Sequence, residues 1–200
     1  MRKRALNAVA PGTLISYRER HAIVLEHLPQ GVFVQLVDPI EDHAFGKTND
    51  WRESDLRQYL NGEFARLLCE GNADELLDTV TDLTAMDGTT DYGSSVDKVT
   101  LLTIDQCRKY RYTRPLPDEW EWTSTPASTP GGWDENKRYA CCLSTYGNVY
   151  RNFCANTRGA RPAFTLPSNL CVELPHCTGL ADYTDAELLE ELLKRQQCEK

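Results

Sequence analysis

Apolar and polar residues alternate in three short segments near the start of the chain, at residues 13–17, 22–28 and 32–37. A period of two is typical of strands that bury one face. The sequence Pro29-Gln30-Gly31 between the last two segments predicts a hairpin turn. Because such short connections leave no room for crossover helices, we expect an antiparallel meander.

From Ser54 onward the apolar residues recur at helical spacing as far as Leu68, which predicts a helix. Ser54 or Asp55 can cap its first turn, and Gly62 interrupts its pattern. A second short helix is predicted at residues 73–80. A polar, glycine-rich loop is predicted at residues 87–95.

Residues 98–102 predict a further strand, and a capping box follows it. In this box the Thr103 hydroxyl and the Gln106 side chain satisfy free backbone donors at the start of a helix. The helix should end near Tyr110, because the prolines at 115 and 117 cannot continue it.

A second capping box, at Thr184 and Glu187, begins a predicted helix over residues 184–197 that carries a stripe of leucines. This helix either docks on its own domain or stands off on the linker 177–183. In the second case it would bind a partner or a second copy of the chain. Both interpretations stay open.

The segment 120–172 differs from the rest in its polar and aromatic character. It comprises a loop rich in Gly, Pro, Ser and Thr, a hairpin that turns at Tyr146-Gly147, a second polar loop and a closing strand at residues 161–164. Arg158 and Arg161 are expected to brace that closing strand. None of its residues suggests a catalytic apparatus.

Alternation assigns the hairpin residues to two faces. Leu143 and Val149 are the expected core anchors. Cys142, Tyr150 and Asn152 should then point outward.

Composition excludes several classes of protein. Hydrophobic residues make up 40% of the 200 residues, enough for the core of a single domain. The formal net charge of −8 counts against nucleic-acid binding, which needs clustered Lys and Arg. No apolar run approaches the roughly 18 residues that span a bilayer. The basic start is followed at once by Pro11-Gly12, so we expect no secretory signal, and a phage particle or the cytoplasm as the location.

The eight cysteines form no C-x-x-C pair, and no histidine stands in metal-like register with a cysteine pair. Cys171 and Cys177, with His176 beside them, are the weak exception. We therefore expect reduced thiols, no metal and no cofactor.

Two motifs carry a family resemblance: W-x-x-S-x-L-R-x-x-L-N at residues 51–61 and G-A-R-P-A-F at residues 159–164. Their order around the meander, the Trp122-Thr-Ser-Thr segment and the Tyr-Gly-Asn-Val hairpin resembles the DUF6273 family of bacterial and phage proteins, over about residues 11–174. That family is similar in turn to the C-type-lectin-like fold of formylglycine-generating enzymes and of diversity-generating retroelement variable proteins.

The resemblance implies an α+β, C-type-lectin-like domain with two packed helices, small antiparallel sheets and long surface loops. The expected organisation is an N-terminal lead (1–12), this domain (13–176) with a ligand-binding face at about 128–157, and a C-terminal helix (180–200). In retroelement variable proteins such a face binds the ligand. Here the ligand would be a protein or a cell-surface molecule.

The segment also has the residue types of a binding surface, with aromatics for rigid contact area and Ser, Asn and Gly for adaptable hydrogen bonds. For any single residue, a half-buried place in the sheet is at least as good an interpretation. The candidate ligand-binding residues are Trp133, Asp134, Asn136, Arg138, Tyr139, Cys142, Tyr146, Tyr150, Asn152, Phe153, Ala155, Asn156 and Thr157.

Residues 138–172 contain no Lys, Glu, Gln, Trp or Met, although these types make up 34 of the 200 residues. Codons that end in a pyrimidine cannot encode these five types. Retroelement variable proteins diversify at adenines in such codons, so the gap is what that history would leave. Strands also lack Lys and Glu for other reasons.

The leading hypothesis is a non-enzymatic variable protein of this fold. One alternative is a virion or surface structural protein whose hairpin is ordinary surface. Another is an oxidase related to formylglycine-generating enzymes that uses Cys141, Cys142 or Cys154, although no activating histidine lies nearby in the sequence. No calcium-binding carbonyl and carboxylate set is visible, so glycan binding does not follow from the fold.

Overall fold

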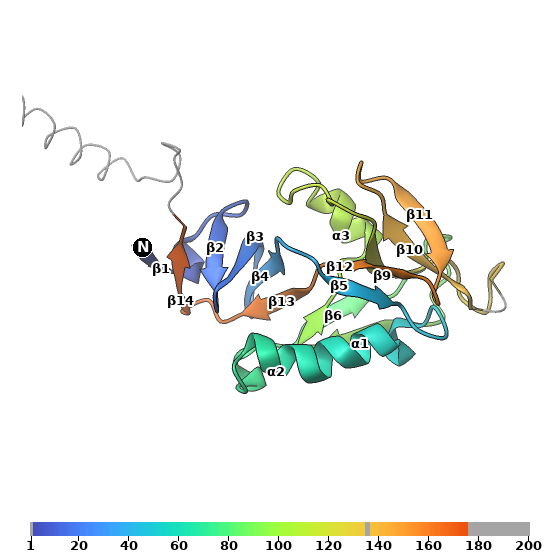
Figure 1. Cartoon of the computed structure of the whole chain (residues 1–200), viewed down its shortest axis with the longest axis horizontal. Coiled ribbons are helices and arrows are strands. Elements are labelled where there is room, and N and C mark those ends of the chain that lie inside the picture. Colours follow the sequence, from blue (N-terminus) through green and yellow to red (C-terminus); the bar gives the residue numbers. More distant parts are fainter. Residues whose placement is uncertain (1, 135–136, 176–200) are drawn as a thin grey trace, which may run out of the picture.

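The computed structural model describes residues 2–134 and 137–175. Within these residues the fold is α+β, with mainly antiparallel sheets and short helices (Figure 1). The predicted C-terminal helix at 184–197 lies outside them. No helix in the described part is long and apolar enough to cross a membrane.

The larger sheet confirms the predicted meander. In order across the sheet, the strands are β1 (Arg2–Ala5), β14 (Cys171–Leu174), β2 (Leu14–Tyr17), β3 (Arg20–Leu28), β4 (Gly31–Leu36), β13 (Ala163–Leu166) and β8 (Val99–Thr100). Strands β2, β3 and β4 are neighbours and antiparallel. The closing strand β13 pairs antiparallel with β4, which returns the chain to the N-terminal strands. The described part of the expected lead, residues 2–12, supplies β1 and buries Leu6 and Val9.

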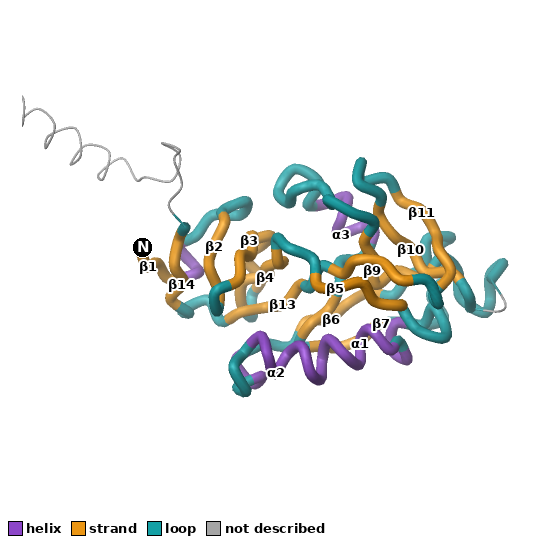
Figure 2. Tube along the Cα trace, viewed as in Figure 1, coloured by secondary structure: helices purple, strands orange, loops and turns teal. Residues whose placement is uncertain are grey.

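A second sheet has the hairpin at one edge. Figure 2 shows this edge at the opposite end of the molecule from β1 and β14. Its strands, in order, are β11 (Val149–Phe153), β10 (Tyr139–Leu143), β9 (Glu121–Pro126), β12 (Thr157–Ala160) and β5 (Ile40–Ala44).

A third, two-stranded sheet joins β6 (Thr79–Asp82) and β7 (Ser94–Asp97). The predicted helix at residues 73–80 is therefore wrong, since only residues 73–75 form a 3-10 turn. The β-branched residues Thr79 and Thr81 are buried on one face of β6 and place their hydroxyls 2.8 Å from that of Thr165 and 3.0 Å from that of Thr100, respectively. Burial with a period of two overrides weak helical spacing here.

The helix predicted from Ser54 is one helical run: α1 (Asp55–Tyr59), a π-helical turn (Leu60–Phe64) that contains Gly62, and α2 (Ala65–Leu68). The Ser54 side chain accepts the backbone N–H of Arg57, as a cap does. Figure 1 shows the run along one side of the molecule, near β6.

The W-x-x-S-x-L-R-x-x-L-N motif ties this helical run to the strands. Trp51 Nε1 donates to Asp97 Oδ2 at 3.0 Å, and Arg57 Nε donates to Asp97 Oδ1 at 2.6 Å. Asn61 Oδ1 accepts the backbone N–H groups of Lys98 and Val99. Asp97 is buried, and Trp51 and Arg57 supply the hydrogen bonds that its carboxylate needs there. The motif therefore has a structural role.

Helix α3 (Ile104–Lys109) begins at the predicted capping box, with both reciprocal hydrogen bonds between Thr103 and Gln106 present, and is capped at Tyr110. It packs between the larger sheet and the hairpin, where Cys107 shares a buried cluster with Leu143. On the sheet side, Lys109 Nζ and Tyr110 Oη bind the Glu26 carboxylate of β3. The helix therefore packs against the face of the hairpin that carries Cys141 and Leu143.

Candidate functional site

The hairpin of β10 and β11 turns at the predicted residues, Tyr146 and Gly147. Leu143 pairs with Val149 and Tyr139 with Phe153, so these residues share one face. The turn closes with a 3.0 Å bond from Ser144 N–H to the Asn148 carbonyl. Gly147 has a φ of 74°, which glycine adopts without steric cost.

The prediction that Cys142 points outward is wrong, because its side chain is fully buried. The alternation itself is confirmed, since Cys142 pairs with Tyr150 on the face opposite Leu143. However, β10 lies between β9 and β11 and is covered on both faces. Cys142 packs in the main core with Trp122, while Cys141 packs under Ile104 of α3. Of the two hairpin strands, only β11, at the edge of the sheet, leaves side chains exposed on both faces.

On the face shared with Leu143, three aromatic rings gather around an arginine. The ring of Tyr139 lies 4.5 Å from that of Phe153 and 5.8 Å from that of Trp133, between centroids. The Arg151 guanidinium carbon lies 4.5 Å from the Trp133 centroid and 5.6 Å from the Tyr139 centroid. Trp133 is 45% exposed and Phe153 46%. We call these four residues the Arg151 cluster.

The opposite face of β11 carries a second group. The ring of Tyr150 lies 4.9 Å from that of Trp120, and the Arg158 guanidinium carbon lies 5.9 Å from the Trp120 centroid. Tyr150 and Trp120 are both exposed. We call these three residues the Trp120 cluster. Arg158, expected only to brace the closing strand, lies beside an exposed ring.

Arg161 takes the bracing role that was predicted for it. It is buried, and its Nε lies 3.3 Å from Glu121 Oε2. Burial lowers the pKa of Arg161, and the Glu121 carboxylate partly offsets this effect.

Asp134, a predicted ligand-binding residue, is instead a buried structural acceptor. Its Oδ2 accepts the backbone N–H groups of Arg138 at 2.8 Å and Tyr139 at 2.9 Å. Asn49 Nδ2 donates to the same oxygen at 3.3 Å and to the carbonyls of Ser128 and Tyr139. A short polar side chain that bonds nearby backbone groups is a common loop device. Asp134 and Asn49 therefore hold the loop that presents Trp133.

The other candidates divide by exposure. Asn152 is half-buried, and its Oδ1 accepts Asn156 Nδ2 at 2.7 Å, a contact within the hairpin. Asn136 lies outside the described residues. The remaining exposed candidates are Arg138, Tyr146, Ala155, Asn156 and Thr157, with Tyr146 78% exposed.

The hairpin segment is locally basic within an acidic chain. Residues 136–172 contain no Asp or Glu, while the whole chain has a net charge of −8. Lys137, Arg138, Arg151 and Arg158 all fall in this segment. Among the described residues, no group of three or more His, Cys, Asp or Glu side chains could hold a metal ion.

The hairpin thiols are poor nucleophiles. Burial raises the pKa of Cys141 and Cys154 to about 12 and that of Cys142 to about 11. At neutral pH these groups stay protonated, whereas thiolate is the reactive form. This environment counts against the cysteine-dependent alternative.

Sequence reasoning missed Arg151 and Trp120. A signal for Arg151 was present, because alternation placed it on the same face of the return strand as Phe153. Trp120 gave no such signal, since only the fold brings the residue before β9 beside β11.

Comparisons with protein-family models, curated proteins and solved structures found no match for this chain. The α+β class therefore rests on the structure, and the function must be argued from the hairpin and its surroundings.

Proposed function

We propose that this chain is a non-enzymatic ligand-binding protein whose ligand-binding face varies in sequence on a C-type-lectin-like scaffold. The face consists of the Arg151 cluster, the Trp120 cluster and the exposed residues at both ends of the hairpin. By its resemblance to the DUF6273 family, the chain is a retroelement variable protein of a phage or bacterium. Its target is a protein or a cell-surface molecule.

The observation that carries the proposal is the contrast between β10 and β11. In β10 the side chains from Ala140 to Leu143 are buried, whereas β11 exposes Tyr150, Arg151 and Phe153 on its two faces. A single soluble domain normally leaves large apolar side chains scattered, while clustered exposed aromatics mark interaction sites. Trp, Tyr and Arg are also the residues that dominate binding energy at interfaces.

The support beneath this face is rigid. Helix α3 covers the buried residues Cys141 and Leu143 of β10, and the hydrogen bond between Asn49 and Asp134 fixes the loop that precedes the hairpin. Function carried by exposed positions on a fixed support is a common arrangement. Exposed residues can then change without altering the fold, which a diversified protein requires.

A structural role in a particle is the second candidate, and the position of β11 favours it. Among the described strands, β11 pairs on one side only, with β10. An unpaired edge offers backbone donors and acceptors to another strand, including that of a second copy. The hydrodynamic mass of the purified chain separates the two, because an assembly protein would form a dominant oligomer without any ligand.

Two small libraries test the binding proposal. One randomises four exposed positions, Trp133, Tyr150, Arg151 and Phe153. The matched control randomises four buried positions of β10, residues 140–143. We expect most members of the first library to fold and, after selection on an immobilised protein, to yield saturable binders, whereas most of the second unfold. Equal loss of folding in both libraries, or no binder from the first, would contradict the proposal.

A further inference from the structure

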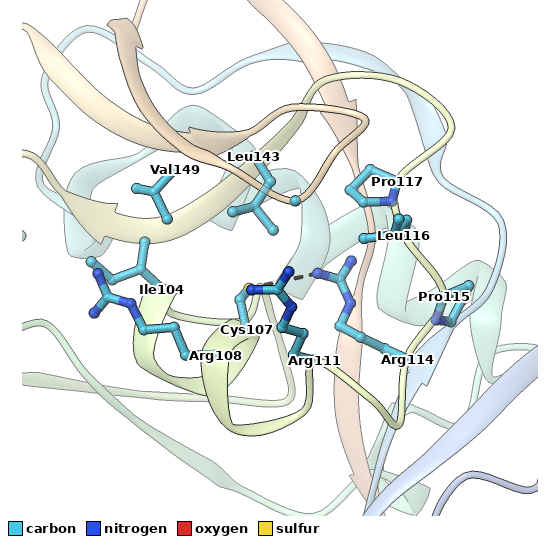
Figure 3. Close-up of a pocket in the computed structure, with 11 residues that line it drawn as sticks. Ile104, Cys107, Arg108, Arg111, Arg114, Pro115, Leu116, Pro117, Leu143 and Val149 are labelled. Carbon is cyan, nitrogen blue, oxygen red and sulfur yellow. Dashed lines mark hydrogen bonds between the residues drawn. The ribbon is translucent and has the colours of Figure 1, made fainter.

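A small pocket lies beside the hairpin, between α3, the segment 114–117 and the turn at Gly147 (Figure 3). Ile104, Leu143 and Val149 give it an apolar wall. The turn closes one end, since a Cβ built on Gly147 would lie 3.1 Å from Leu116 Cδ2. It does not include the exposed aromatic residues of the two clusters.

The opposite side of the pocket is cationic. Figure 3 shows the Arg111 and Arg114 guanidinium groups directed into the same region below Leu143. Arg114 is buried, pairs with Glu121, and places Nη1 3.7 Å from Cys107 Sγ. Its Nε is buried without a hydrogen-bond partner among the described residues.

The buried charges do not balance. Glu121 is the single carboxylate that pairs with both Arg114 and Arg161 in the described part of the chain. Arg161 is also attracted by Asp118 and Asp38, so Arg114 is the less compensated of the two guanidinium groups. A buried charge is costly unless it is compensated. Another anion near Arg114 would supply that compensation.

Arg111 supplies a donor that is available to a ligand. It is exposed at the mouth of the pocket, and its guanidinium, unlike its backbone N–H, has no hydrogen bond or ion pair to any described residue. Its neighbour Arg108, by contrast, binds Asp105 at 2.6 Å. An unpaired guanidinium beside a second one is a geometry suited to a carboxylate, which accepts charge-assisted hydrogen bonds from both.

The size of the pocket limits what can enter. Its volume is about 60 Å³. One water needs at least about 10–15 Å³, and a cavity that takes benzene measures about 150 Å³. The pocket therefore admits a group of a few heavy atoms rather than a cofactor or a nucleotide.

We infer that this pocket binds a carboxylate on a short apolar stem, with the stem against Leu143 and Val149 and the carboxylate between Arg111 and Arg114. A glutamate side chain has this chemistry, and so does a free short-chain acid. Because the pocket adjoins the turn of the hairpin, an acidic residue of a ligand held by the exposed face could enter it. The inference does not depend on that face being variable.

The test is an NMR titration of the full-length chain with propionate, which reproduces the end of a glutamate side chain, and with propionamide, its neutral isostere. We expect saturable shifts at residues that line the pocket, with a millimolar Kd for propionate and at least about tenfold weaker binding of propionamide. The Arg111→Gln variant should bind propionate about tenfold more weakly. Arg66→Gln, which removes an exposed arginine of α2 that does not line the pocket, should leave the Kd unchanged.

One peptide separates the two possible sources of the carboxylate. A Gly-Gly-Glu-Gly-Gly amide that binds more tightly than propionate indicates a peptide ligand, whereas a weaker one indicates a free acid. Equal binding of propionate and propionamide, or an unchanged Kd in Arg111→Gln, would overturn the inference. Trp133→Ala should leave the Kd for propionate unchanged, because Trp133 does not line the pocket. The pocket inference and the proposed binding face can therefore fail independently of each other.

Discussion

The guanidinium carbon of Arg151 lies 4.5 Å from the centre of the Trp133 ring, although the two residues belong to different segments. Arg151 projects from the edge strand β11, and Trp133 from the loop that Asn49 and Asp134 hold. This contact joins the loop and the strand into one surface. It also explains how an exposed tryptophan can be kept at a fixed place without being buried.

The contact between Arg151 and Trp133 should be measurable as a coupling. An exposed cation–π pair contributes about 0.5–1 kcal/mol. We expect a double-mutant cycle of Arg151→Ala and Trp133→Ala, followed by urea unfolding, to give a coupling in that range. The matched cycle of Arg138→Ala with Trp133→Ala should give none. Independent effects in the first cycle would show that the two side chains do not hold one another.

Asn49 should matter more for stability than any exposed candidate residue. It is fully buried, donates to two backbone carbonyls and to Asp134, and accepts the Tyr92 hydroxyl at 2.8 Å. Removing a partner from buried polar groups costs about 1–3 kcal/mol each. Asn49→Ala should therefore lower the unfolding free energy by at least about 2 kcal/mol and speed amide exchange in residues 128–134.

The exposed Asn148 provides the control for Asn49. Asn148→Ala should change the unfolding free energy by less than about 0.5 kcal/mol, as is usual for surface substitutions. If Asn49→Ala proves equally mild, the loop before the hairpin is held by other contacts.

The buried thiols should resist labelling. Burial raises the pKa of Cys107 and Cys141 to about 12 and that of Cys142 to about 11, so almost no thiolate exists at pH 8. We expect iodoacetamide at pH 8 to modify the exposed Cys171 in the native protein and these three only after unfolding, as mapped by mass spectrometry. Rapid native labelling of Cys141 or Cys142 would revive the oxidase alternative.

Replacing Gly31 and Gly62 by alanine should change the stability of the protein in opposite directions. A Cβ on Gly31 would lie 2.4 Å from the Leu166 carbonyl oxygen, so Gly31→Ala must displace β13 or β4 and should cost about 1–3 kcal/mol. A Cβ on Gly62 meets nothing within 4 Å in the helical run, so Gly62→Ala should stabilise by about 0.5–1 kcal/mol. Thermal unfolding of both variants checks the pair. A stable Gly31→Ala protein would show that the two strands are not so tightly apposed.

Much of the fold could be predicted because local signals decide it. Alternation of apolar and polar residues predicted the meander, the capping box predicted the start of α3, and the hairpin turns at the expected residues. Each of these features is determined by residues that are close together in the sequence. The helix predicted at residues 73–80 was wrong because the chain forms β6 from Thr79 onward, and the hydroxyl partners of β6, Thr165 and Thr100, lie on other strands.

The site was predicted less completely, for the same physical reason. The alternation of the hairpin was right, yet it could not show that α3 covers one face of β10 while the main core covers the other and buries Cys142. Asp134 has the composition of a contact residue but is used to hold its own loop. Whether a side chain is exposed depends on what packs over it, which a local pattern does not contain.

Deep sequencing of this gene across many isolates, scored codon by codon, shows whether the exposed face of the hairpin is diversified. We expect substitutions concentrated at adenines in the codons of exposed residues such as Tyr146, Tyr150 and Asn156. The buried positions Cys141, Cys142 and Leu143 of the same hairpin should stay constant. Substitutions spread evenly over exposed and buried positions, or none in residues 128–157, would contradict diversification and leave a structural role as the better account.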